Sequence, residues 1–83
     1  MTRYLILCKS LTHAQRSARL LERAGITATV IKSESGLSTK GCRYAVQLMR
    51  HFDEAVLILR DSDMLAGKLY VQIEDGVYEE IMR

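Results

Sequence analysis

The distribution of apolar residues along the chain predicts six secondary-structure elements. Short stretches rich in large apolar or β-branched residues indicate strands, whereas apolar residues three or four positions apart indicate helices. In chain order we expect a strand at 3–9, a helix at 10–25, strands at 26–32 and 42–49, a helix at 51–63 and a strand at 68–74. A turn at Asp75 and Gly76 follows, and the tail 77–83 forms either a short helix or an added edge strand.

The first helix carries recognisable signals at both of its ends. Thr12 is followed three positions later by Gln15, which is the pattern of a capping box. Gly25 stands where a left-handed residue would end the helix. Ala14 and Ala18 share one apolar stripe, and their small size lets the helix lie close to a sheet.

The order strand, helix, strand, strand, helix, strand is that of the ferredoxin-like split unit. It predicts one α+β domain over 1–83, a ferredoxin-like βαββαβ sandwich in which two helices cover one face of a four-stranded antiparallel sheet. Within the third strand, Tyr44, Val46 and Leu48 alternate with more polar positions, which predicts one buried face. Because this fold hosts many unrelated functions, the fold does not select one.

Composition narrows the class of protein. With 48% apolar and 27% charged residues, the chain is globular rather than disordered. No apolar run approaches the ~20 residues of a membrane span, and the first ten residues lack a cleavage site, so we expect a cytoplasmic protein without a membrane partner. Two cysteines, far apart in sequence, predict neither a disulfide framework nor a metal site, and we expect no cofactor. The net charge of +2 is spread along the chain and does not predict nucleic-acid binding.

Cys42 is the main chemical candidate, because it lies where a small polar loop becomes a strand. Lys40 and Arg43 flank it and would favour the thiolate form, which is the nucleophile. Gly41 removes a side chain next to the thiol, so that a partner's sulfur could approach. The hydroxyls that could hydrogen-bond an anionic sulfur are those of Ser38 and Thr39.

The same position allows an inert interpretation. Cys42 is in phase with Tyr44 and Val46, so simple alternation along the strand would bury it. Unpaired cysteines are among the most often buried residues in proteins. The residues alone leave both a reactive and a core role open.

Cys8 and the two histidines are weaker candidates. Cys8 ends an apolar strand, and a role as resolving thiol would require its α-carbon to lie within ~7 Å of that of Cys42. His13 stands beside the loop after the first strand, where a neutral imidazole could act as a base toward a thiol. His51 has no partner at metal-ligand spacing and is interpreted as a solvated helix-start residue. No motif of a hydrolase or a nucleotide-binding protein is present.

The stretch "KGCRYAVQL" also begins like an RNA-recognition signature in the third strand of this fold. Such recognition needs two or three stacking aromatic side chains, and only Tyr44 is present. RNA binding is therefore ranked below the two functions considered next.

Nearly the whole chain resembles a selenium/sulfur carrier-like family of small bacterial domains of unknown function. Its signature is a serine and then a histidine at the entry to the first helix, matched by Ser10 and His13, and a serine-rich loop ending in a cysteine beside glycine, matched by Ser38, Gly41 and Cys42. The stretches that carry the resemblance are "YLILCKSLTHAQRSARLLERAGI", "GLSTKGCRYAVQL" and "GKLYVQIEDGVYEEI".

The resemblance implies a carrier rather than a true enzyme. Cys42 would hold a persulfide or perselenide, assisted by Lys40, Arg43, His13, Ser10 and the loop hydroxyls, and the partners would be sulfur or selenium donor and acceptor proteins. The alternative is a protein-interaction or regulatory module, with Cys42 in the core, that uses its sheet or edge strands to bind a partner or to form a homodimer.

Overall fold

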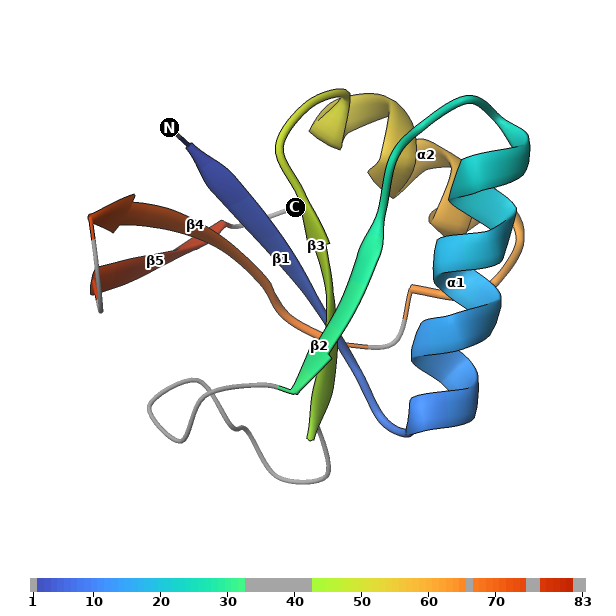
Figure 1. Ribbon diagram of the computed structural model, residues 1–83, viewed down its shortest axis with the longest axis horizontal. Helices are drawn as coiled ribbons and strands as arrows, with labels where there is room; N and C mark the ends of the chain where they lie inside the picture. Colours follow the sequence, from blue (N-terminus) through green and yellow to red (C-terminus); the bar gives the residue numbers. More distant parts are fainter. Residues whose placement is uncertain (1, 33–42, 66, 75–76, 82–83) are drawn as a thin grey trace.

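The computed structural model describes residues 2–32, 43–65, 67–74 and 77–81, and these form an α+β structure with two helices and a five-stranded sheet (Figure 1). None of the helices in these ranges is long and apolar enough to span a membrane. The elements are β1 (Arg3–Cys8), α1 (Leu11–Arg23), β2 (Thr29–Lys32), β3 (Tyr44–Leu48), α2 (Phe52–Asp61), β4 (Leu69–Glu74) and β5 (Val77–Ile81).

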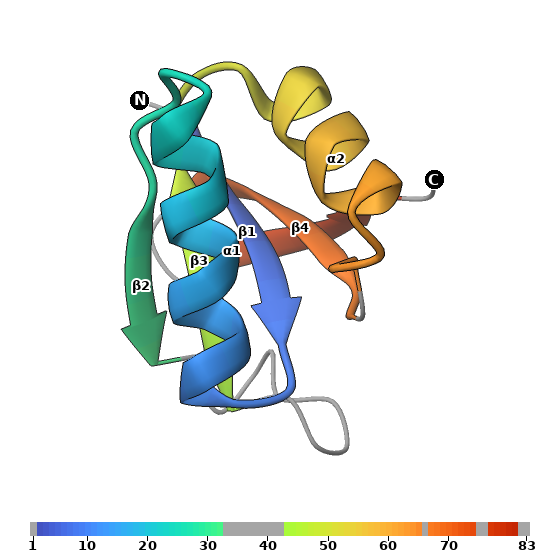
Figure 2. The same cartoon turned by 90° about the vertical axis from the view of Figure 1, so that its right-hand side faces the viewer.

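The strands lie in the order β2-β3-β1-β4-β5, and every neighbouring pair is antiparallel. The prediction of four strands is therefore wrong by one, because the tail pairs with β4 as the strand β5. Of the two alternatives for the tail, the edge strand is the correct one. Figures 1 and 2 show α1 and α2 on the same side of the sheet, as expected.

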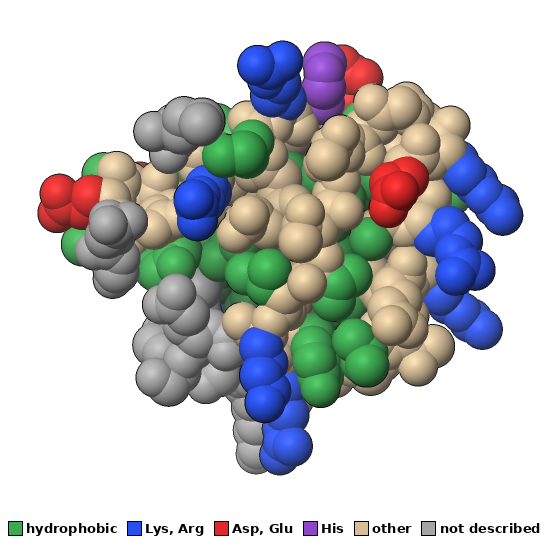
Figure 3. All heavy atoms as spheres, viewed as in Figure 1, with side chains coloured by type: hydrophobic (Ala, Val, Ile, Leu, Met, Phe, Trp, Pro, Cys, Tyr) green, Lys and Arg blue, Asp and Glu red, His purple; other side chains and the backbone are tan. Residues whose placement is uncertain are grey.

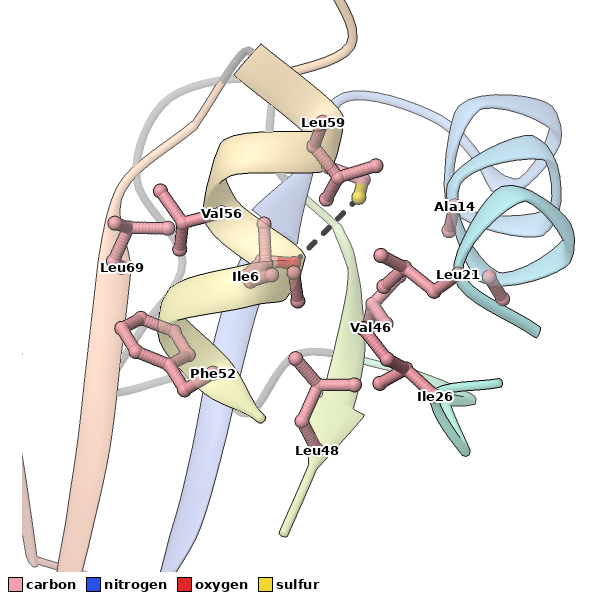
Figure 4. Close-up of a cluster of buried hydrophobic side chains, with 13 residues drawn as sticks. Ile6, Ala14, Leu21, Ile26, Val46, Leu48, Phe52, Val56, Leu59 and Leu69 are labelled. Carbon is pink, nitrogen blue, oxygen red and sulfur yellow. Dashed lines mark hydrogen bonds between the residues drawn. The ribbon is translucent and has the colours of Figure 1, made fainter. Parts of the chain in front are cut away.

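Between the helices and the sheet lies the main core. Its strand residues come from alternate positions of β1 and β3, such as Ile6, Val46 and Leu48, while α1 and α2 contribute residues at helical spacing, such as Leu21 and Leu59 (Figure 4). All five side chains are at most 1% exposed. The alternation predicted for the third strand is confirmed on this face.

A second, smaller apolar cluster lies on the opposite face of the sheet. It is formed by Leu5, Leu7 and Ala45, which are at most 2% exposed. The half-buried side chains that pack against it come from β2, β4 and β5 and are Ile31, Tyr70 and Tyr78. The third strand is thus also buried at Ala45 on its second face, which the sequence did not predict, because side chains of the outer strands pack there.

The boundaries of α1 differ from the sequence prediction. The helix is capped by Ser10, whose hydroxyl oxygen accepts a hydrogen bond from the backbone N–H of His13 at 3.1 Å, and not by Thr12. Ser10 has the extended backbone of an N-cap, with φ −147° and ψ 165°, whereas Thr12 is already helical. Gly25 adopts the left-handed conformation predicted for it, with φ +85°.

The second strand is shorter than predicted. The backbone N–H of Ile26 donates to the carbonyl of Leu21 at 2.9 Å, so that Ile26 completes the end of the helix instead of joining the sheet. Its side chain is nevertheless buried in the main core. Regular pairing with β3 begins only at Thr29.

Candidate functional site

Most of the predicted thiol site lies outside the described residues. These positions are Ser38, Thr39, Lys40, Gly41 and Cys42. Arg43, which is bonded to Cys42, is described: it directly precedes β3, and its side chain is exposed. The structure therefore shows the sheet end to which Cys42 is attached.

Three cationic residues lie at this end of the sheet. Tyr44, the first residue of β3, pairs with Cys8 of β1 on one side and with Lys32 of β2 on the other. Lys9 follows Cys8 and Arg43 precedes Tyr44, so both lie next to this row across three strands. Blue side chains project at the lower end of the molecule in Figure 3, below β2 and β3 of Figure 1.

The sequence did not predict this cluster of Lys9, Lys32 and Arg43, because the positive charges are spread along the chain. All three side chains are exposed, and none has an ion-pair partner among the residues that the structure describes. Cations favour a nearby anion, including a thiolate. The antiparallel pairing of β2 with β3 is the signal that could have revealed the cluster, because it brings the end of one strand to the start of the next.

Ser10 lies at the same end, in the connection from β1 to α1. Its oxygen holds the first turn of the helix through the hydrogen bond to the His13 backbone. The hydroxyl hydrogen of Ser10 can still donate to another group. Ser10 thus stabilises the start of the helix, which does not exclude the assisting role predicted for it.

His13 is tied to the segment after α2. Its Nε2 atom lies 2.7 Å from the backbone carbonyl oxygen of Met64, and because a carbonyl only accepts, Nε2 carries the hydrogen. In the neutral ring Nδ1 is then the lone-pair nitrogen, and this atom is buried without a hydrogen-bond partner in the described structure. The geometry favours a packing role for His13 over that of a base.

Cys8 is part of the main core. Its side chain is 1% exposed, and its thiol donates to the carbonyl of Ile6 at 3.6 Å, as the dashed line in Figure 4 shows. A cysteine buried among apolar side chains is inert toward reagents in solution. Cys8 is therefore a core residue.

Tyr44 does not fit the role of a base-stacking residue. It packs against the main core on the side of the helices, in phase with Val46 and Leu48. A stacking platform would lie on the opposite face, where Ala45 is fully buried.

Within the described residues, no three histidine, cysteine or acidic side chains are grouped so as to bind a metal.

At the other end of the sheet, two hollows flank the loop from β3 to α2. Met49, Arg50 and His51 line both of them. One hollow, of about 480 Å³, is completed by side chains that include Asp53 and Glu54. The other, of about 680 Å³, is completed by the connection from α1 to β2 and by Thr2 and Gln47. No sequence motif marks this loop, and it contains no glycine that would signal its backbone conformation.

Comparison with known proteins adds no assignment: no family model, no curated protein and no solved structure matches the chain.

Proposed function

We propose that this protein is a carrier that holds sulfur or selenium on Cys42 and passes it to a partner protein. In the loading step the Cys42 thiolate attacks the terminal sulfur of a donor persulfide. A sulfur–sulfur bond to Cys42 forms, the donor's own sulfur–sulfur bond breaks, and the donor leaves as its thiolate. Such an exchange needs no oxidant, because the sulfane sulfur moves at its existing oxidation level.

The cationic cluster is the observation that supports this proposal. Lys9, Lys32 and Arg43 lie at the end of the sheet to which Cys42 is bonded. Consecutive α-carbons are ~3.8 Å apart, so the backbone of Cys42 lies beside that of Arg43. A positive potential there would favour both the thiolate and the anionic persulfide.

The fold is compatible with the same proposal. The order β2-β3-β1-β4 with two helices on one face corresponds to the ferredoxin-like unit, to which β5 is added at the edge of β4. We assign the chain to that fold as part of the proposal, together with its resemblance to the carrier-like family.

Cys42→Ser is expected to abolish loading. The full-length protein is incubated with glutathione persulfide, and the gain of one sulfur atom is followed by intact-mass spectrometry, with loss of the added atom on reduction. The parent should load one atom and Cys42→Ser none. The matched control is Cys8→Ala, which removes the core thiol and should load normally if it folds.

A Cys42→Ser protein that loads as well as the parent would contradict the proposal.

The electrostatic argument is tested separately with Lys32→Gln, which should slow loading by at most about fivefold, because exposed charge pairs contribute only about 1 kcal/mol or less. Arg16→Gln, an exposed arginine of α1, should leave the rate unchanged.

A second candidate function, a protein-interaction module, is favoured by the hairpin of β4 and β5. β5 is an outermost strand of the described sheet. Its first residue, Val77, is 43% exposed, and Ile73 of β4 is 61% exposed. Such an edge can pair with a second copy of the chain. We expect Ile73→Thr to weaken any homodimer detected by sedimentation velocity. Only monomer at all concentrations of the parent protein would contradict this function.

A further inference from the structure

A second site is suggested by the larger hollow, at the end of the sheet opposite to the cationic cluster. Its lining includes Thr29 and Gln47, which pair with each other across β2 and β3. Figures 1 and 2 both show the connection from α1 to β2 beside the connection from β3 to α2 at this end. A hollow of about 680 Å³ is within the size range of small-molecule sites.

The polar groups that line this hollow can donate hydrogen bonds. Its described lining includes the threonines Thr2, Thr27 and Thr29, the amide residue Gln47 and the cation of Arg50, and no carboxylate residue is among the described residues that line it. Hydroxyl, amide and guanidinium groups all donate hydrogen bonds to an anion, and arginine suits carboxylate and phosphate best. Arg50 has no ion-pair partner in the part of the chain that the structure describes.

The neighbouring hollow differs in charge. It is lined by Asp53 and Glu54, and Oε1 of Glu54 lies 3.4 Å from Nδ1 of His51. Carboxylates repel an anion on that side of the loop. Met49, 41% exposed, lines both hollows and offers an apolar surface beside Arg50.

The loop that carries Arg50 has an unusual backbone. His51 is left-handed, with φ 59° and ψ 34°, although it is not glycine, and its side chain makes no cap bond to α2. This conformation is strained for a residue with a β-carbon. Such strained residues cluster at ligand-binding sites.

We infer that the larger hollow binds a small organic oxyanion, a carboxylate or a phosphate monoester, with the anionic group on Arg50 and the threonine hydroxyls and the organic part on Met49. This site does not depend on the carrier function, because it lies at the other end of the sheet from Arg43 and uses none of the thiol-site residues. Binding there and loading of Cys42 are separate measurements.

The test is a titration of the full-length ¹⁵N-labelled protein, at constant ionic strength, with phenyl phosphate and in parallel with benzoate. These probes share an apolar ring and differ in the anion, so the tighter of the two identifies the class. Amide signals of Thr27, Thr29, Gln47 and Arg50 should shift together along one saturable curve. Arg50→Gln should weaken binding about tenfold, as expected for loss of a charge-assisted hydrogen bond.

Arg19→Gln is the matched control, since Arg19 is an exposed arginine on α1 outside the hollow. It should bind either probe as the parent does. Absence of saturable shifts with both probes would overturn the site. Equal losses in Arg50→Gln and Arg19→Gln would also overturn it, because they would show attraction by net charge alone.

Discussion

Gly67→Ala is expected to destabilise the protein by about 3 kcal/mol, because there is no space for a β-carbon at this position. A β-carbon on Gly67 would lie 2.4 Å from the backbone oxygen of Leu7 and 2.9 Å from its carbonyl carbon. The two backbones are held together by the hydrogen bond from the N–H of Leu7 to the carbonyl of Lys68, at 3.0 Å. Since β1 is central in the sheet, Leu7 cannot move aside without disturbing strands on both sides.

Chemical denaturation of Gly67→Ala and of Gly25→Ala measures this effect. Gly25 has φ +85° but nothing within 4 Å of its added β-carbon, so the cost there is only the strain of a left-handed alanine, about 1 kcal/mol. Equal losses of unfolding free energy in the two variants would contradict the close approach of Gly67 to β1.

Leu59→Ala should cost about 2–5 kcal/mol of unfolding free energy, through the loss of buried apolar contacts and the cavity left behind. Leu59 is fully buried and belongs to the main core together with Val56 of α2 and Ile6 of β1, all three of which are labelled in Figure 4. The substitution therefore removes contacts between α2 and the sheet.

Leu57→Ala is the matched control, because it makes the same chemical change in the same helix. Leu57 is 48% exposed, and surface substitutions of this kind usually change stability by less than about 0.5 kcal/mol. The midpoints of urea denaturation compare the two variants. If Leu57→Ala lost as much stability as Leu59→Ala, the face that α2 presents to the sheet would be assigned wrongly.

The elements of the fold were largely predictable because hydrophobic periodicity decides them. The run from Leu5 to Cys8 is buried on both faces, and its continuous apolar character is typical of a central strand, which β1 is. The cap of α1 was misplaced because Ser10 and Thr12 both have suitable side chains, and only the extended backbone at Ser10 decides between them. The burial of Ala45 depends on side chains of β2, β4 and β5, which are distant in sequence.

The candidate sites were less predictable. The sequence singles out Cys42 through its neighbours, but the contribution of Lys9 and Lys32 depends on the pairing of three strands. His13 was considered as a base because of its place in the sequence, whereas its bond to Met64 arises from packing between segments 51 positions apart. The left-handed His51 and the hollows beside it follow from tertiary structure, for which a single sequence has no local signal.

The most direct test of the carrier proposal is the rate of thiol alkylation in the folded protein as a function of pH, with Cys42→Ser as background. Because Cys8 is 1% exposed, the parent protein can be used without replacing this core residue. We predict a fast reaction that Cys42→Ser lacks and that reaches half of its maximal rate at a pH clearly below the pKa of about 8.5 of an ordinary thiol. A thiol that reacts only after the protein is unfolded would contradict the proposal and would place Cys42 in the core.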